Sequence, residues 1–178
     1  RAMFRHRAVP YLRRLSQGVI LSRSLRLFGL GESAVEAELR DEMNAMTNPT
    51  LAPYAKIGEV ELRITARGAD EAAAQALIAP VEEELRGRFG PRIYGADVNS
   101  LEQVLLGLLK DRGLTLGTAE SCTGGLAAKR MTDLAGSSAV FRGGVVSYTN
   151  EVKRDVLGVS EDLLDREGQV IDRVLCTY

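Results

Sequence analysis

The chain has 178 residues, of which 45% are hydrophobic and 26% charged, enough for one large or two small domains with buried cores. Its 23 lysines and arginines almost balance its 24 aspartates and glutamates, so the formal net charge of −1 gives no electrostatic attraction to nucleic acid or anionic membranes. No apolar run approaches the roughly 18 residues that a membrane span needs. Two cysteines are too few for a disulfide framework and lack zinc-ligand spacing, so we expect a protein of the reducing cytoplasm without a metal.

The first half of the sequence predicts a small α+β module over residues 17–95, preceded by residues 1–16 as the tail of an earlier helical element. Residues 19–28 alternate between apolar and polar side chains, which indicates a strand. Ser33 and Glu36 have the spacing of a capping box, which predicts that a helix begins there.

The rest of this module predicts a hairpin and a long helix. Residues 60–66 alternate strictly, and Gly58 before them predicts the turn of the hairpin. Asp70 has the position of a helix cap, Pro80 predicts a kink, and Gly90 followed by proline predicts the end of the helix. We therefore expect three or four strands with helices on one face.

The second half, residues 96–178, predicts an α/β domain. Asn99 and Glu102 have capping-box spacing ahead of a helix with a wide apolar face. Strands and helices then alternate in βαβα order, which favours a largely parallel sheet flanked by helices. The predicted elements are strand 114–119, helix 123–135, strand 143–149 and helix 151–157.

Ser121 lies where the first of these strands should turn into a helix whose first turn carries Gly124 and Gly125. We expect an exposed hydroxyl there, with backbone N–H groups pointing at whatever it attacks. The alternative is that Ser121 only caps the helix. Because the single histidine, His6, lies more than a hundred residues upstream, a nucleophilic serine would need a different base.

Lys153 and Tyr148 are the side chains best able to accept a proton from serine when histidine is absent. A lysine can act as a base only if burial or a cationic neighbour favours its neutral form. The alternatives are a solvated helix lysine at position 153 and a tyrosine packed in the core at position 148.

For each of the residues next to Ser121, the sequence allows both a role in the chemistry and a purely structural role. Cys122 could be a thiol nucleophile, but no histidine is available to pair with it. Glu120 is more readily structural, holding either Lys153 or the turn, than a general base. Gly124 and Gly125 allow either close approach of an oxyanion or phosphate to the backbone or tight helix–sheet packing.

These motifs resemble the CinA family, specifically its C-terminal nicotinamide-mononucleotide deamidase domain of the PncC type. Residues 17–95 are similar, more loosely, to the KH-like middle domain of the long CinA proteins, and residues 1–16 to the end of their first domain. The resemblance rests on Thr118-Ala-Glu-Ser-Cys-Thr-Gly-Gly125, Ala135-Gly-Ser-Ser138, Phe141-Arg-Gly-Gly144, Ser147-Tyr-Thr-Asn-Glu-Val-Lys153 and Leu157-Gly-Val159.

The resemblance implies hydrolysis of the carboxamide of nicotinamide mononucleotide to the acid and ammonia, without a metal or cofactor. It places the nucleophile on Ser121 and the base on Lys153, with Tyr148 beside them. It also implies a partial three-layer α/β deamidase fold for residues 96–178. The substrate-binding residues that it implies are Glu120, Cys122, Thr123, Gly124, Gly125 and Asn150.

The family pattern continues past Glu167 into further substrate-binding residues, whereas residues 171–178 of this chain depart from it. We therefore expect an incomplete domain that lacks its second pocket wall and is weakly active or inactive. The alternative function is a non-catalytic scaffold or nucleic-acid-associated module. Nucleic acid is an unlikely partner because residues 17–95 have no Gly-x-x-Gly loop between two helices, whereas a homo-oligomer is compatible with the sequence.

Overall fold

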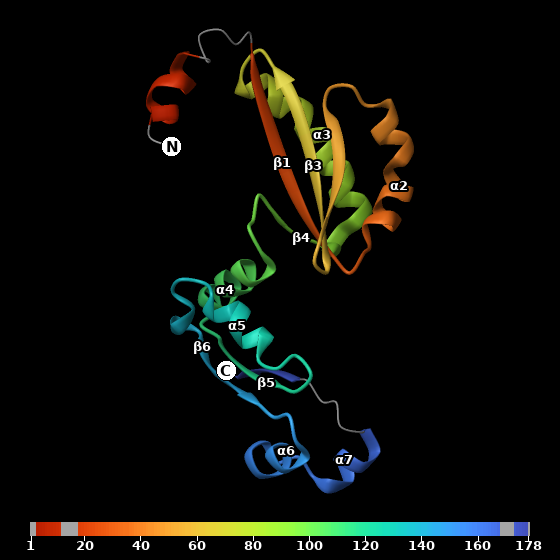
Figure 1. Cartoon of the computed structure of the whole chain (residues 1–178). Helices are drawn as coiled ribbons and strands as arrows, with labels where there is room; N and C mark the ends of the chain where they lie inside the picture. The colour runs from red at the N-terminus through yellow and green to blue at the C-terminus, as the bar shows by residue number, and fades with distance from the viewer. Residues whose placement is uncertain (1–2, 12–17, 168–172, 178) are drawn as a thin grey trace. The chain divides into compact units, whose positions relative to one another are not determined.

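The chain forms two compact units, residues 1–98 and residues 99–178 (Figure 1). The computed structural model describes residues 3–11, 18–167 and 173–177. Part of the predicted tail forms a helical turn, η1 (Phe4–Ala8), while residues 1–2 and 12–16 of it lie outside the described residues. Across the described ranges, no helix combines the length and apolar character that crossing a bilayer requires.

The first unit is built on a four-stranded antiparallel sheet in the order β2-β3-β1-β4. The predicted strand at 19–28 and the hairpin around Gly58 are confirmed, and Gly58 adopts the left-handed φ of +73° that favours glycine in a tight turn. The strands are β1 (Val19–Phe28), β2 (Thr50–Lys56), β3 (Glu59–Gly68) and β4 (Ile93–Ala96).

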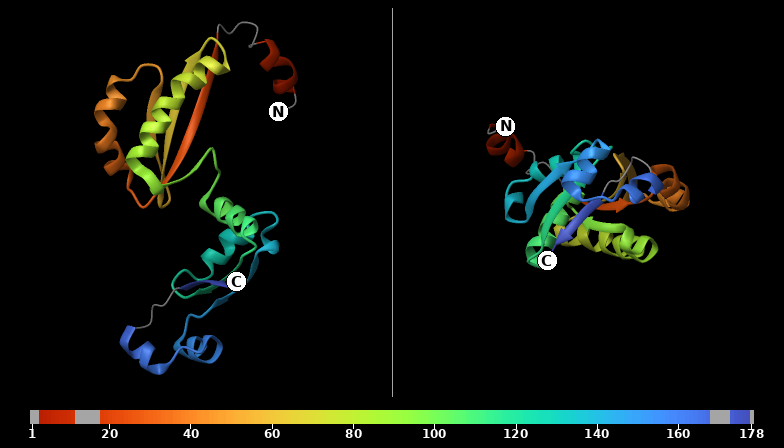
Figure 2. Two further views of the ribbon diagram at one scale, coloured as in Figure 1. Left: turned by 180° about the vertical axis from the view of Figure 1, so that it is seen from behind. Right: turned by 90° about the horizontal axis from the view of Figure 1, so that it is seen from below.

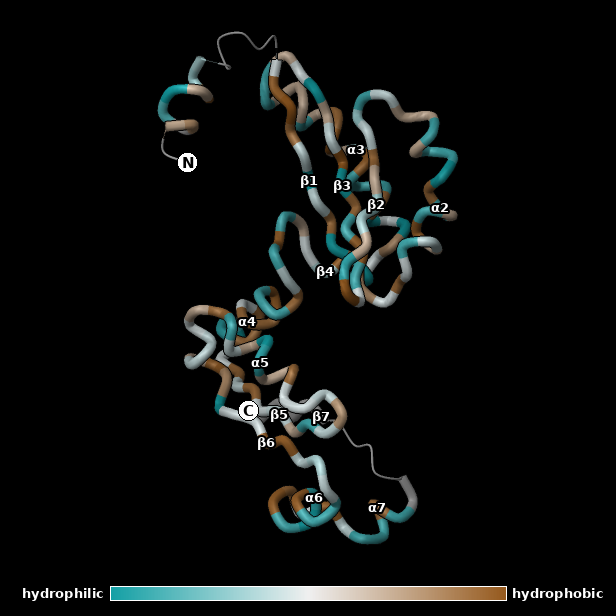
Figure 3. The backbone as a smooth tube through the Cα atoms, viewed as in Figure 1, coloured by the Kyte–Doolittle hydropathy of each residue, from teal (hydrophilic) through white to brown (hydrophobic). Residues whose placement is uncertain are grey.

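Helices α2 (Glu32–Ala45) and α3 (Glu71–Phe89) lie on the same face of this sheet, as expected (Figure 2). Every second residue of β3 is apolar and buried, and the alternation of hydropathy along the strand is visible in Figure 3. The core between the helices and the sheet contains Leu25, Leu27, Val35, Leu39, Val60, Leu62, Ile64, Ile78 and Leu85, among others.

The opposite face of the sheet carries a charged network centred on Glu61, whose side chain is only 4% exposed. The Arg63 guanidinium contacts one Glu61 oxygen at 2.8 Å, and the Ser24 hydroxyl donates to the same oxygen at 2.8 Å. The other oxygen lies 3.5 Å from Lys56 Nζ and 3.7 Å from the Arg26 guanidinium. Three cations and a hydroxyl therefore surround one carboxylate on this face.

Helix α3 begins as predicted, because the Asp70 side chain accepts a hydrogen bond from the Ala73 N–H at 2.8 Å. The helix continues through Pro80 and ends at Gly90, where φ is +52°.

Two predicted capping boxes are wrong in their cap residue. Helix α2 has extended Gly31 as its N-cap and no side-chain cap, so Ser33 already lies within the first turn. In the second unit, Ser100 and not Asn99 is the cap, since its hydroxyl accepts from the Gln103 N–H at 3.2 Å. In both places the residue that takes the extended backbone conformation decides where the helix begins.

The second unit contains a three-stranded sheet in the order β6-β5-β7. Strands β5 (Thr115–Glu120) and β6 (Phe141–Val146) pair in parallel, as predicted, and β6 forms one edge. Strand β7 (Arg173–Thr177) pairs antiparallel with β5, which corrects the expectation of a largely parallel sheet. Residues 168–172, which precede β7 and include part of the predicted departure from the family pattern, lie outside the described residues.

Helices α4 (Leu101–Asp111) and α5 (Leu126–Thr132) pack with β5 around a small core. Its buried members are Leu106, Leu109, Leu116, Met131 and Val140. A short helical turn, η3 (Ser137–Ala139), leads into β6, and α6 (Asn150–Leu157) and α7 (Glu161–Glu167) follow that strand. The chain thus has the predicted mixed fold class, an α+β module followed by an α/β unit.

Candidate active site

The candidate site is built where β5 and β6 end. Because the two strands are parallel and adjacent, the loops that follow them start at the same edge of the sheet. The junction is fixed by Ser147, whose N–H and hydroxyl both donate to the Glu120 carbonyl oxygen, at 2.7 and 3.2 Å. Ser147 is fully buried, and the sequence analysis did not single it out beyond the family motif.

The loop over residues 121–125 connects β5 to α5. Helix α5 begins only at Leu126, with Gly125 as its N-cap, because Gly124 and Gly125 both adopt left-handed φ values of +61° and +96°. Ser121 is therefore not the cap of this helix, and the predicted helix start at position 123 is wrong. The Gly124 N–H donates to the Ser121 carbonyl at 3.1 Å, and the Leu126 N–H donates to the Thr123 carbonyl at 3.1 Å.

Ser121 itself is only 4% exposed, contrary to the expectation of an exposed hydroxyl. The loop after it folds back in a turn instead of entering the helix directly, so the residues on the outside of the turn are Cys122, Thr123 and Gly124. Cys122 is exposed and forms no disulfide.

Glu120, the last residue of β5, turns its carboxylate toward the start of α5. One oxygen accepts from the Ala127 N–H at 2.8 Å and from the Thr123 hydroxyl at 2.9 Å, and the other accepts from the Ala128 N–H at 2.8 Å. Burial alone would raise the pKa of this carboxyl, but the hydrogen bonds from Ala128, Ala127 and Thr123 outweigh burial and lower the pKa below its usual value. Glu120 therefore holds the turn, and it satisfies first-turn amides of a helix that lacks a cap of its own.

Lys153 lies in the first turn of α6, whose N-cap Thr149 accepts from the Val152 N–H at 3.5 Å. The Lys153 side chain is only 1% exposed and is among the largest fully buried side chains of the described residues. In folded proteins, lysine side chains are almost never fully buried unless they are paired. This burial contradicts the interpretation of Lys153 as a solvated helix lysine.

Tyr148 and Asn150 flank the start of α6. Tyr148 is 74% exposed, which excludes the alternative of a core-packed tyrosine, and Asn150 is half-buried as the first residue of the helix. Both residues lie in the segment that joins the end of β6 to Lys153. The structure therefore places the predicted site residues in two segments, 120–125 and 148–153, that start from neighbouring strand ends.

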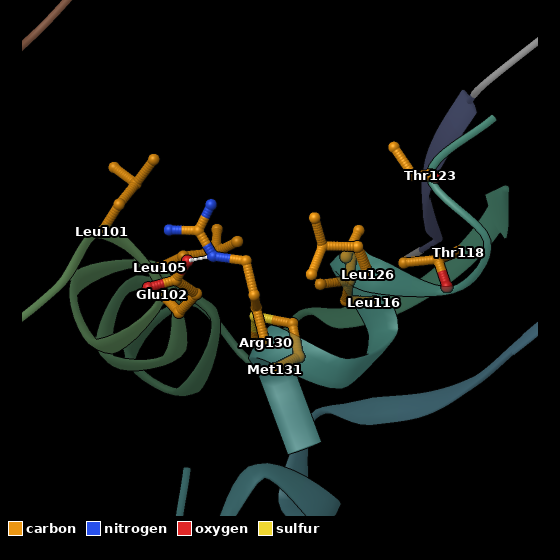
Figure 4. Close-up of a pocket in the computed structure, with 10 residues that line it drawn as sticks. Leu101, Glu102, Leu105, Leu116, Thr118, Thr123, Leu126, Arg130 and Met131 are labelled. Atoms are coloured by element: carbon orange, nitrogen blue, oxygen red, sulfur yellow. Dashed lines mark ion pairs between the residues drawn. The ribbon is translucent and has the colours of Figure 1, made fainter. Parts of the chain in front are cut away.

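One cavity adjoins the first of these segments, and another lies along the two strands that lead to them. An apolar one of about 270 Å³ lies between α4 and α5, and at its rim Arg130 reaches the Glu102 carboxylate (Figure 4). It borders the loop through Thr123, but its lining includes neither Ser121 nor Lys153. The other, of about 330 Å³, lies along β5 and β6 and is lined largely by small residues, namely Gly117, Ala119, Gly143, Gly144 and Val145, with Leu157 of α6. In the described part of the chain, no group of three His, Cys, Asp or Glu side chains is placed to hold a metal ion.

Two family models match the chain almost end to end. The model of the damage-inducible protein CinA KH domain matches residues 22–95, and that of the CinA C-terminal domain matches residues 98–176. A protein of Symbiobacterium thermophilum with a competence-damage inducible name is 51% identical over 177 residues, covering 98% of this chain and 42% of its own length. A CinA-like protein of Kosmotoga olearia is 45% identical over 168 residues, covering 94% of this chain and 41% of its own length.

Among solved structures, the competence/damage inducible protein CihA of Agrobacterium tumefaciens is 49% identical, with a TM-score of 0.36 over 36% of this chain and 39% of that chain. The chain spans about two fifths of the length of the curated relatives that it matches. The two adjoining matches agree with the division into two units at residues 98 and 99. The chain thus belongs to the CinA family, of which it carries the KH domain and the C-terminal domain.

Proposed function

We propose that the second unit hydrolyses the carboxamide of nicotinamide mononucleotide to nicotinate mononucleotide and ammonia, with Ser121 as nucleophile and Lys153 as base. The observation that carries the proposal is the burial of a lysine in the segment after β6, next to the strand end that bears a buried serine. A lysine amine in its neutral form is a base that can take a proton from a serine hydroxyl. The one histidine of the chain, His6, belongs to the other unit.

The reaction has two halves, the acylation of Ser121 and the hydrolysis of the acyl ester, and each half needs two proton transfers. Ser121 Oγ attacks the carboxamide carbon while the neutral Lys153 amine takes the hydroxyl proton. When the tetrahedral intermediate collapses, the carbon–nitrogen bond breaks and Lys153 returns the proton to the leaving ammonia. Water then attacks the acyl ester, Lys153 accepts the water proton, and Ser121 leaves with that proton as the acid is released.

The oxyanion of each tetrahedral intermediate requires backbone donors in the loop over residues 122–125, where the Gly124 N–H already donates to the Ser121 carbonyl. The first-turn amides of Ala127 and Ala128 are unsuitable, because Glu120 already accepts from both. The outward-facing residues of the two segments are suited to contact the nucleotide, namely Cys122, Thr123, Gly124, Tyr148 and Asn150. We place the reaction in the cytoplasm, where a cysteine outside any disulfide, such as Cys122, stays reduced.

The test is ammonia release from nicotinamide mononucleotide by the chain, compared with three variants. We expect weak release, which Ser121→Ala and Lys153→Met each lower by more than about a thousandfold because nucleophile and base act as a unit. Lys153→Arg should not restore it, since a guanidinium does not give up its proton near neutral pH. Circular dichroism should show that all three variants remain folded.

The matched control is Cys122→Ala, which alters the side chain next to Ser121 but leaves the Ser121 hydroxyl in place. Because Cys122 is placed against the nucleotide and not at the reacting atoms, we expect this variant to keep kcat, with any loss appearing as a higher KM. If ammonia release survives in Ser121→Ala and disappears in Cys122→Ala, the nucleophile is the Cys122 thiol and not Ser121. No release by the unaltered chain above the Ser121→Ala background would remove support for a hydrolase and leave the scaffold alternative.

A further inference from the structure

Glu120 accepts hydrogen bonds from the loop after β5, from helix α5 and from the residue that follows the end of β6. Its carboxylate accepts from Thr123 in the loop after β5 and from the first turn of α5. Its main-chain carbonyl accepts from both donors of Ser147, directly before the segment that leads to Lys153. Glu120 also immediately precedes Ser121 in the chain.

The contacts of Glu120 are those of a side chain held in one conformation. The residue is only 3% exposed, and both carboxylate oxygens accept from protein donors at 2.8 to 2.9 Å. Charge-assisted hydrogen bonds of this length are about twice as strong as neutral ones. Because the N-cap of α5 is a glycine without a side-chain acceptor, Glu120 supplies the negative charge that favours the N-terminus of this helix.

We propose that Glu120 is a positioning residue for the reaction proposed above. Its carboxylate fixes the loop that carries Ser121 against α5, while its carbonyl fixes the end of β6 that leads to Lys153. One residue thereby sets the separation of nucleophile and base. The expected effect on the reaction rests on the proposed function. The expected effect on the loop rests on the hydrogen bonds alone.

Glutamine is the informative replacement at this position. It keeps the length and shape of the side chain, but its NH₂ group cannot accept from a backbone N–H. Either Ala128 on one oxygen or Ala127 on the other therefore loses its partner. Thr123→Val is a milder second variant, because it removes one donor to the carboxylate and leaves both amides paired.

The kinetic experiment measures kcat and KM on nicotinamide mononucleotide. For Glu120→Gln we expect kcat to fall about 10- to 100-fold with KM changed less than about threefold, as misplacement of reacting groups predicts. Thr123→Val should lower kcat less. The control is Ser100→Ala, which removes a helix cap elsewhere in the same unit and should change neither constant. A rise in KM with kcat unchanged in Glu120→Gln would instead make Glu120 a substrate contact and overturn the proposal.

A second measurement does not depend on activity. Cys122 lies exposed in the same loop and outside any disulfide, so its alkylation rate with iodoacetamide, followed by mass spectrometry of its peptide, reports on the loop. We expect Glu120→Gln to accelerate this reaction at least threefold, because the loop is released and a neighbouring negative charge is removed. Ser100→Ala should leave the rate unchanged. An unchanged rate in Glu120→Gln overturns the positioning role, whereas absence of ammonia release by the unaltered chain overturns only the proposed function.

Discussion

Glu61 in the first unit offers a direct test of how a sheet face covered by charges is stabilised. Burial alone would raise the pKa of this carboxyl, but hydrogen bonds from Arg63 and Ser24 and the charges of Arg26 and Arg63 outweigh burial and lower the pKa from 4.5 to about 2. The ionised form is therefore favoured in the folded state. Replacing Glu61 by glutamine removes the charge while keeping the shape of the side chain.

The size of the effect follows from the two pKa values. A lowering of about 2.5 units corresponds to about 3 kcal/mol of folding free energy from ionised Glu61 at pH 7. Because the folded-state pKa is the lower one, this stabilisation is complete above pH 4.5 and is lost as the pH falls toward 2. At pH 3 about 1 kcal/mol should remain. The difference in stability between the unaltered chain and Glu61→Gln should thus shrink by about 2 kcal/mol between pH 7 and pH 3.

Hydrogen exchange of the peptides that cover β3, measured in increasing urea, separates the first unit from the second. Glu83→Gln is the matched control, since Glu83 is an exposed carboxylate on α3 for which we expect less than about 0.5 kcal/mol at either pH. If the free energies of unfolding of the unaltered chain and Glu61→Gln differ by the same amount at pH 7 and pH 3, the argument is refuted. An equal effect in Glu83→Gln would assign the change to net charge instead of the network.

Two further changes test local features of each unit. Asp70→Ala removes the acceptor of the Ala73 N–H and should destabilise the first unit by about 1 kcal/mol in urea titrations, while Asp70→Asn should cost less. Gly144→Ala would bring a methyl group to 2.3 Å from the Thr118 hydroxyl, so it should destabilise the second unit and speed hydrogen exchange in β5 and β6. Thr118→Ala in the same chain should recover part of that loss, and no recovery would point to a different clash.

The sequence predicted the elements of the first unit well, because most of its core is encoded in local alternation. Strand β3 alternates strictly, and the Asp70 cap and the Gly90 stop are local signals that no distant contact overrides. The cap residues of α2 and α4 could not be fixed from spacing alone. There, the neighbouring residues Gly31 and Ser100 take the extended conformation that a cap requires.

The residues of the candidate site stay predictions, and their geometry differs from the one that the sequence led us to expect. The start of α5 at Leu126 depends on Glu120, which supplies acceptors from the preceding strand, and on two left-handed glycines. The burial of Ser121 and Lys153 results from tertiary packing, which no local pattern reports. The antiparallel pairing of β7 with β5 joins segments more than fifty residues apart, and such non-local pairing leaves little local signal.

The register in which β5 and β6 pair fixes the relative positions of the loops that follow the two strands. Thr118 pairs with Gly144 and Glu120 with Val146, and the one irregularity of the register lies upstream, between Leu116 and Gly117. A slip by one residue would advance one loop past the other by about 3.3 Å, as far as the whole reach of a hydrogen bond. It would also turn every side chain of the slipped strand to the opposite face. In the proposed mechanism, the hydrogen-bond ladder of two short strands therefore sets how close the serine and the lysine from different loops can come.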